Sequence, residues 1–521
     1  MKAAWIALVS TLLLGLTAPA RADDDLPPVG HSRFDELVGD RPVPYPFNRL
    51  AETINRQMRA DPGGLPPLKI TLIPLGRSLQ RDAGAPDFFR IPRVVAAADG
   101  ANRRGFAPLK DRLFLGFHEQ GEVIEVISYN DAAARFEFQV VRDYAPGKAP
   151  QVFHARRDLC LACHQNAAPI FSRPLWDETP ANPAIAARLR ETGRDFYGIK
   201  VTGTDIAYLI DAATDRANKF AIWQLLWQQG CGEGDEGDTC RQEAFTTALA
   251  YARSLRLPAP TALPRLDQTW RALWPDGLPI PNPDLPNRDP LAMLTDPAND
   301  PLLLRPPLEL WRAPDKTAFV VGLAGMLDPA AVERLERAEL STPLERLRAR
   351  GAFAARPFGP NLLDALLAQI GKPRLAAHTH LPRPRLEPTT AARGEDPLTT
   401  PFRANCAACH DTTLPHPPNF LHGNPAAVAE QLDQCAERIF VRLSQADLPE
   451  AARSRPPMPP AAALLGRGID PGHWVASPEF AALKAAAQAR LGDRDPQALL
   501  RQPYEQLRPC LPSSLRAEHT P

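Results

Sequence analysis

The sequence predicts a mainly α-helical protein with a small antiparallel β domain near the N-terminus and many proline-rich loops. Short β-branched and aromatic runs cluster in the first third of the chain, and apolar residues recur at helical spacing after it. Proline accounts for 59 of the 521 residues. Because proline removes a backbone donor and interrupts helices and central strands, we expect long ordered but irregular loops.

The N-terminus has the pattern of an export signal. Lys2 is followed by an apolar stretch from Ala3 to Leu16 and by the small-x-small sequence Ala20-Arg21-Ala22. This pattern predicts a signal peptide over residues 1–22, cleaved near Ala22, with an uncleaved membrane anchor as the alternative. No later segment reaches the ~18 apolar residues of a membrane span. We therefore expect a periplasmic protein with no transmembrane segment in the mature chain.

Residues 23–150 are predicted to form the N-terminal β-rich domain. Up to about residue 66 the chain is polar and proline-rich, and no element is assigned. The predicted strands are rich in β-branched and aromatic residues and are separated by turn-like pieces. They cover residues 68–73, 93–97, 112–117, 122–129 and 135–141.

Residues 151–375 are predicted to form a helical domain interrupted by proline-rich loops. Apolar residues at helical spacing predict helices over 204–227, 330–350 and 361–370. Residues 258–315 are dense in proline and are expected to wrap the surface. Residues 376–398 are also rich in proline and are predicted to be a linker.

Residues 399–521 carry clear signals for helix ends. Asn424 and Pro425 suit the cap and first position of a helix whose apolar residues share one face. Ser477 and Pro478 start another helix, and Gly492 is its expected stop. These signals predict a separate C-terminal helical domain.

Charge composition limits the class of partner. The chain has 60 basic and 60 acidic residues, so its formal net charge is zero. A strongly basic molecule, as expected for binding nucleic acid, is therefore not predicted.

Eight cysteines divide into two groups of four. Four belong to two short motifs considered below, and the others are Cys231, Cys240, Cys435 and Cys510. In an exported chain spare cysteines tend to pair. We favour a short disulfide loop between Cys231 and Cys240 and a second bridge between Cys435 and Cys510. The other pairings and four reduced thiols stay open.

The two motifs share the pattern C-x-x-C-H. One is Cys160-Leu161-Ala162-Cys163-His164 and the other is Cys406-Ala407-Ala408-Cys409-His410. Two cysteines on one helical turn can bond both vinyl groups of a porphyrin, and the adjacent histidine can then bind the iron. A four-cysteine zinc site is the alternative, but 246 residues separate the pairs. The motifs predict two covalently attached c-type haems, with His164 and His410 as iron ligands.

Residues 399–515 resemble a class I mono-haem cytochrome c domain. The resemblance rests on the motif that ends at His410, then Pro417-Pro418-Asn419-Phe420-Leu421, then Arg455-Pro456-Pro457-Met458-Pro459-Pro460 and a terminal helix. In that family a methionine in a Met-Pro-Pro loop is the second iron ligand. The resemblance therefore implies Met458, 48 residues after His410, as the distal ligand of the second haem.

The distal side of the first haem has no comparable signal. His154, which lies ten residues before His164, is one candidate ligand, and Met293 and Met326 are others. An open sixth position is also compatible with the sequence and would permit chemistry at the iron.

Two haems predict electron transfer with a periplasmic redox partner protein. The chain is also distantly similar to the bacterial dihaem cytochrome c peroxidases, which implies as an alternative a peroxidase- or oxygenase-like enzyme that reacts at haem 1. The first motif here begins unusually late and the two motifs are unusually far apart, so no catalytic residue is assigned. A haem-based sensor or binding protein is a further alternative.

Overall fold

The computed structural model describes residues 26–60, 63–74, 89–101, 103, 108–161, 164, 166–171, 179–199, 201, 206–259, 261–281, 308–335, 338–372, 381–387, 397–411, 418–467 and 469–510. The expected signal peptide lies outside these ranges. No helix within them is long and apolar enough to cross a membrane.

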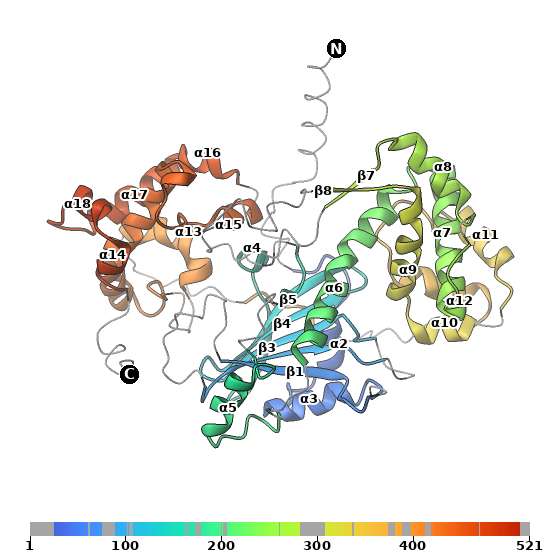
Figure 1. Ribbon diagram of the computed structural model, residues 1–521, viewed down its shortest axis with the longest axis horizontal. Coiled ribbons are helices and arrows are strands. Elements are labelled where there is room, and N and C mark those ends of the chain that lie inside the picture. Colours follow the sequence, from blue (N-terminus) through green and yellow to red (C-terminus); the bar gives the residue numbers. More distant parts are fainter. Residues whose placement is uncertain are drawn as a thin grey trace, which may run out of the picture.

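A six-stranded antiparallel sheet forms the centre of the N-terminal part, and its strand order follows the chain (Figure 1). The strands are β1 (Leu68–Ile73), β2 (Arg93–Ala98), β3 (Leu113–His118), β4 (Val123–Asn130), β5 (Arg135–Arg142) and β6 (Gln151–His154). The first five confirm the sequence prediction to within one residue at each end. Their β-branched and aromatic side chains suit a pleated, largely buried surface.

The sixth strand carries an additional parallel segment that the sequence did not predict. The backbone N–H of His154 donates to the carbonyl of Arg385 at 2.7 Å, and Glu387 N–H donates to the carbonyl of His154 at 2.8 Å. Arg142 pairs with Glu387 beside them. Part of the predicted linker, residues 381–387, is thus held against the sheet edge.

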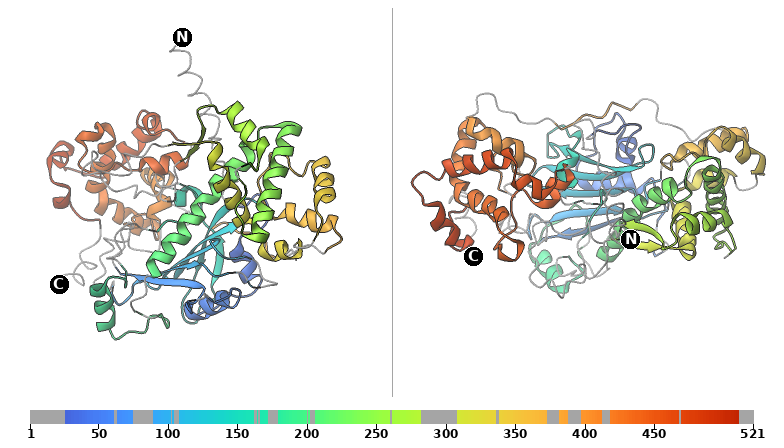
Figure 2. Two further views of the ribbon diagram at one scale, coloured as in Figure 1. Left: turned by 45° about the vertical axis from the view of Figure 1, so that its right-hand side comes forward. Right: turned by 90° about the horizontal axis from the view of Figure 1, so that it is seen from above.

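Different helices cover the two faces of the sheet (Figures 1 and 2). On one face, α2 (Arg33–Val38) and α3 (Phe47–Asn55) bury Phe34 and Leu50 against Leu115 and Val126. On the other face, α6 (Ile206–Gln229) packs Phe220 against Tyr129 and Phe136, with ring centroids 5.0 and 5.9 Å apart. Residues before position 66, unassigned from the sequence, therefore supply one cover of the sheet.

A helical layer follows α6. Its elements are α7 (Gly234–Ser254), α8 (Pro264–Leu273), β7 (Leu278–Pro281), β8 (Leu308–Trp311), α9 (Lys316–Met326), α10 (Pro329–Leu335), α11 (Ser341–Ala349) and α12 (Pro360–Gln369). The predicted helices at 204–227 and 361–370 correspond to α6 and α12. The single helix predicted over 330–350 is wrong, because α10 ends at Leu335 and α11 begins at Ser341.

A disulfide joins Cys231 to Cys240, which is the pairing favoured from the sequence. The residues between them do not form the expected loop, because α7 begins at Gly234 and Cys240 lies in its second turn. The bridge therefore fixes the start of α7 to the end of α6.

The C-terminal domain consists of short helices around one core. They are α13 (Thr400–His410), α14 (Pro425–Ser444), α15 (Ala461–Gly466), α16 (Pro471–Val475), α17 (Pro478–Ala489) and α18 (Pro496–Arg501). The predicted starts are confirmed, since Asn424 and Ser477 each accept a backbone hydrogen bond as N-caps. Helix α17 packs against both α13 and α14.

Candidate functional site

The first C-x-x-C-H motif begins on α4 (Arg157–Leu161), which stands on the face of the sheet shared with α6. Arg157 holds this helix in place, because its Nη1 donates to the carbonyl of Phe136 at 2.7 Å. Its guanidinium also lies 5.3 Å from the ring centroid of Phe138. Cys160 packs beside Phe138 and Val140, so β5 positions the first cysteine of the motif.

A backbone carbonyl orients His164. Its Nδ1 lies 2.8 Å from the carbonyl oxygen of Ala168, and its ring centroid is 5.4 Å from that of Phe138. Because a carbonyl oxygen only accepts, Nδ1 must donate the proton, which leaves the lone pair on Nε2. Burial lowers the pKa of His164, which favours the neutral imidazole that binds iron. Cys163 lies outside the described residues.

Asn218 on α6 supports the turn that supplies this carbonyl. Its Nδ2 donates to the carbonyl of Pro169 at 2.8 Å, and its Oδ1 accepts from Asn166 Nδ2 at 3.0 Å. The side chain is buried. Sequence reasoning missed Asn218 because it lies 52 residues from Asn166 and belongs to no local motif.

The second motif ends α13 and repeats this arrangement. His410 Nδ1 lies 2.7 Å from the carbonyl oxygen of Pro418, so Nε2 again carries the lone pair. The Phe420 ring stacks on the imidazole with centroids 4.2 Å apart. The chain returns to the end of α13, where Leu421 N–H donates to the His410 carbonyl at 3.0 Å. The Pro-Pro-Asn-Phe-Leu sequence therefore supplies both the orienting carbonyl and the stacked ring.

The cysteines of the second motif lie in the half-buried part of α13. Burial, followed by the neighbouring Cys409, raises the pKa of the Cys406 thiol to about 12, and Arg467 acts in the opposite direction. The thiol is therefore protonated near neutral pH when no metal ion or other group is bound. Within the described residues, no cluster of three or more histidine, cysteine or carboxylate side chains could hold a metal ion.

Met458 lies in a loop that α14 anchors. The Met458 N–H donates to the carbonyl of Arg442 at 3.2 Å, and Arg442 Nε donates to the carbonyl of Pro456 at 2.6 Å. Gln445 Oε1 accepts from Ser454 N–H at 2.8 Å. Helix α15 follows the loop. Directly after it, Arg467 Nη1 donates to Asn405 Oδ1 on α13 at 3.4 Å. Met458 and His410 thus belong to one packed domain.

The fold brings the two motif helices together although 246 residues separate them. Cα atoms of α4 lie within 8 Å of Cα atoms of both α13 and α15. Figure 1 shows α4 at the junction between the sheet and the C-terminal domain. Groups attached at the two motifs would therefore be neighbours across this junction.

The geometry does not support His154 as a distal ligand of haem 1. His154 stands opposite Gln139 in the sheet register, and the two side chains share a face. Its Nε2 lies 3.2 Å from Gln139 Nε2 and 3.5 Å from Asp35 Oδ2 on α2. His164 packs on Phe138, which points to the opposite face because side chains alternate along a strand. The sheet therefore separates the two histidines.

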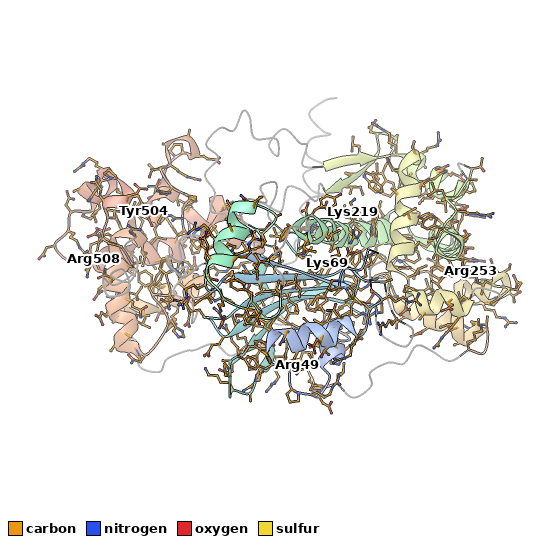
Figure 3. The ribbon with its side chains drawn as sticks, turned by 60° about the horizontal axis from the view of Figure 1, so that its bottom comes forward. Arg49, Lys69, Lys219, Arg253, Tyr504 and Arg508 are labelled. Atoms are coloured by element: carbon orange, nitrogen blue, oxygen red, sulfur yellow. A yellow bond between two sulfur atoms is a disulfide. The ribbon has the colours of Figure 1, made fainter. Side chains whose placement is uncertain are left out.

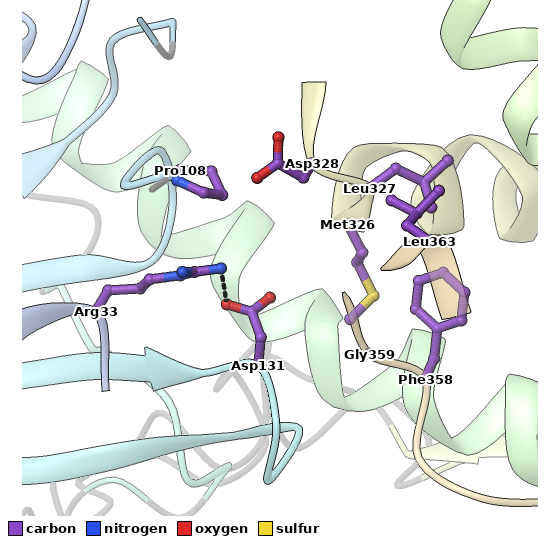
Figure 4. Close-up of a pocket in the computed structure, with 9 residues that line it drawn as sticks. All are labelled: Arg33, Pro108, Asp131, Met326, Leu327, Asp328, Phe358, Gly359 and Leu363. Carbon is purple, nitrogen blue, oxygen red and sulfur yellow. Dashed lines mark ion pairs between the residues drawn. The ribbon is translucent and has the colours of Figure 1, made fainter. Parts of the chain in front are cut away.

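One of the two methionine candidates for haem 1, Met326, lies among the described residues. Met326 lines a small cavity at the turn between β4 and β5, together with Phe358 and the ion pair between Arg33 and Asp131, whose Nη2 and Oδ2 atoms are 2.6 Å apart (Figure 4). His164 packs instead on the middle of β5, so the geometry does not support Met326. Met293 lies outside the described residues.

Both motifs present a set of groups that suits a covalent haem. Each motif histidine is oriented through Nδ1, which leaves the lone pair on Nε2, and packs against a phenylalanine ring, while a cysteine stands four residues before it. Such an outer hydrogen bond is what usually fixes the tautomer of a metal-binding histidine. No family model, curated protein or solved structure matches this chain.

Proposed function

We propose that this chain is an exported c-type cytochrome with two covalent haems that transfers electrons between periplasmic partners. Cys160, Cys163 and His164 would hold haem 1. Cys406, Cys409 and His410 would hold haem 2, with Met458 on its distal side as the resemblance to class I cytochromes c implies. When bound, the haems would supply iron centres that accept and donate single electrons.

The observation that carries the proposal is the matched setting of His164 and His410. Two unrelated segments, one beside a β-sheet and one in a helical domain, place a carbonyl on Nδ1 at 2.8 and 2.7 Å. This hydrogen bond holds the ring in the tautomer that binds iron and increases the basicity of Nε2. A histidine that served packing alone would not require the same orientation at both motifs.

The contact of α4 with α13 and α15 supports electron transfer within one molecule. Porphyrins attached at these helices would lie near each other, so an electron could pass between them without a second protein. Phe138 and Phe420 cover the proximal histidines with apolar surface. Exclusion of water from the iron ligands limits the reorganisation that accompanies a change of charge.

An enzyme that reacts at haem 1 is the alternative, because the placement of His154 leaves the distal side of that haem without an identified ligand. The spin state separates the two functions. Low-spin iron at both sites in electron paramagnetic resonance spectra supports electron transfer. High-spin iron at haem 1 that reacts with peroxide supports the enzyme.

The central test is the mass of the mature protein after export in a host that matures c-type cytochromes. We expect two additions of about 616 Da each, located by peptide mapping at the two motifs. Cys160→Ala with Cys163→Ala should remove one addition, and Cys406→Ala with Cys409→Ala should remove the other. A mature, folded wild-type protein without haem would overturn the proposal.

The proposed ligand of haem 2 has its own test. Met458→His should lower the reduction potential of one haem by roughly 0.1–0.3 V, since axial ligands set haem potentials over about 0.8 V and a thioether favours the reduced iron. Potentiometric titration followed by visible absorbance measures this change in reduction potential. Met326→Leu is the matched control. Equal potentials in Met458→His and wild type would exclude Met458 as a ligand.

A further inference from the structure

Three arginines surround one tyrosine on the C-terminal domain. The guanidinium carbons of Arg438, Arg442 and Arg455 lie 4.9, 5.8 and 5.4 Å from the centroid of the Tyr504 ring. We call these four residues the Tyr504 cluster. Arg508 extends it along the C-terminal segment, and Figure 3 shows Tyr504 and Arg508 on the same domain.

The positive charge of the Tyr504 cluster is only partly compensated. Arg455 pairs with Glu505, but within the described part of the chain neither Arg438 nor Arg442 has a carboxylate partner. Each donates instead to a backbone carbonyl, that of Leu507 at 3.3 Å and that of Pro456 at 2.6 Å. A tyrosine ring attracts a guanidinium through its face only weakly, so it does not replace a counter-ion.

Two donor atoms of the cluster have no partner among the described residues. Arg438 Nε and Arg442 Nη2 are buried and make no hydrogen bond with that part of the chain. A buried donor without an acceptor destabilises the fold, and more so when it is charged. The three arginines are nevertheless partly exposed, so an anionic group brought by another molecule can reach their outer donors.

The cluster adjoins the loop that carries the proposed haem ligand. Arg455 belongs to that loop, and Arg442 holds it through Pro456 and Met458. The Arg455 side chain is 42% exposed. Leu448, which is 38% exposed, lies at the start of the same loop and accepts a hydrogen bond from Arg453. Exposed apolar area and arginines on one loop suit a protein-binding surface, whose core is enriched in arginine and apolar side chains.

We propose that the Tyr504 cluster and Leu448 form the docking surface for an acidic redox protein. Carboxylates of the partner would pair with Arg438, Arg442 and Arg455 and place its redox centre next to the Met458 loop. The basic surface is local, because the chain as a whole carries no net charge. Attraction between complementary patches would steer the encounter and increase its rate. That the partner is a redox protein rests on the proposed function, whereas the acidic character rests on the cluster alone.

The binding test uses the intact mature protein and a fluorescein-labelled decaglutamate peptide as the probe, read by fluorescence anisotropy at low and high salt. We expect decaglutamate to bind at low salt, decalysine not to bind, and binding to fall as salt increases. The double variant Arg438→Gln with Arg455→Gln should weaken binding by at least about threefold and reduce its salt dependence.

Arg501→Gln is the matched control, because Arg501 is an exposed arginine on α18 of the same domain. Arg442 is left unchanged, since it holds the Met458 loop. Equal binding by wild type and the double variant would overturn the proposal, as would equal binding of decaglutamate and decalysine.

A kinetic test then asks whether the surface serves electron transfer. Oxidation of the reduced protein by ferricyanide, an anion, should slow in the double variant at low salt. Oxidation by the tris(phenanthroline)cobalt(III) cation should not slow in the double variant. Loss of peptide binding without any effect on the ferricyanide rate would refute a redox role for the surface. A protein without haem would refute the proposed function, and the peptide would still report on the surface.

Discussion

Carbonyl groups outside the two motifs orient the residues that would bind iron. Ala168 serves His164 and Pro418 serves His410, and in the first case Asn218 on a distant helix holds the turn. The motifs themselves were evident from the sequence because cysteine spacing and the adjacent histidine encode attachment locally. The groups that orient the histidines were not evident from the sequence. A backbone carbonyl has no sequence signature, and Asn218 acts across 52 residues.

His154 gives a prediction at this scale. It is 1% exposed and belongs to a network with Asp35 and Gln139 on the α2 side of the sheet. His154→Ala should therefore lower the free energy of unfolding by about 1–3 kcal/mol through its unpaired neighbours. The absorption and paramagnetic resonance spectra of haem 1 should stay as in wild type. A changed spin state at haem 1 would restore His154 as a ligand.

The same network predicts that the stability of the fold depends on pH. Burial alone would raise the pKa of Asp35, but hydrogen bonds from His154, Ser32 and Gln139 outweigh it and lower the pKa. A carboxylate with a lowered pKa stabilises the fold above its unfolded pKa of about 4, and this contribution is lost as pH falls through the folded value.

The free energy of unfolding should therefore decrease below about pH 4, with this residue adding at most about 1.4 kcal/mol per pH unit. Asp35→Asn should reduce the slope, whereas Asp493→Asn, at an exposed position, should not. Denaturant titrations at several pH values measure both, and parallel curves for Asp35→Asn and wild type would contradict the assignment.

At the scale of elements, predictions succeeded where the information was local. Five strands and the starts of α14 and α17 were predicted because alternation and N-caps are visible in a short window. Strand β6 was missed because it has four residues and its outer neighbour is residues 381–387. Helix α7 was missed because its first turns are rich in glycine and aspartate, and the Cys231–Cys240 disulfide holds them to α6.

The second cysteine pair gives a prediction for α14 and the C-terminal segment. Cys435 is buried on α14 and its thiol contacts that of Cys510, although the two are not bonded here. Burial, followed by this contact, raises the pKa of Cys435. Gln434 Nε2 donates to the Pro509 carbonyl at 2.7 Å and holds the segment beside the helix.

A thiol oxidant should therefore convert the pair to a disulfide, with loss of two protons and two electrons to the oxidant. Peptide mapping without reduction should find the Cys435–Cys510 bridge. Replacing both cysteines by serine should destabilise the C-terminal domain by about 2–5 kcal/mol. Alkylation of both thiols in the unreduced, unfolded protein would show that the bridge is absent.

For the molecule as a whole, the contact of α4 with α13 and α15 brings the two motifs close together. We predict that an electron given to one haem reaches the other by a first-order process. Rapid photochemical reduction followed at the two absorption bands should give a rate that does not change with protein concentration. A rate proportional to concentration would mean that the exchange occurs between molecules.

The strand-like attachment of residues 381–387 to β6 turns the linker into a short tether. Only nine residues, 388–396, separate Glu387 from Pro397, where the C-terminal domain begins. Fully extended, they reach about 30 Å. The C-terminal domain therefore stays at a high effective concentration, of millimolar order, near α4 even when the two separate.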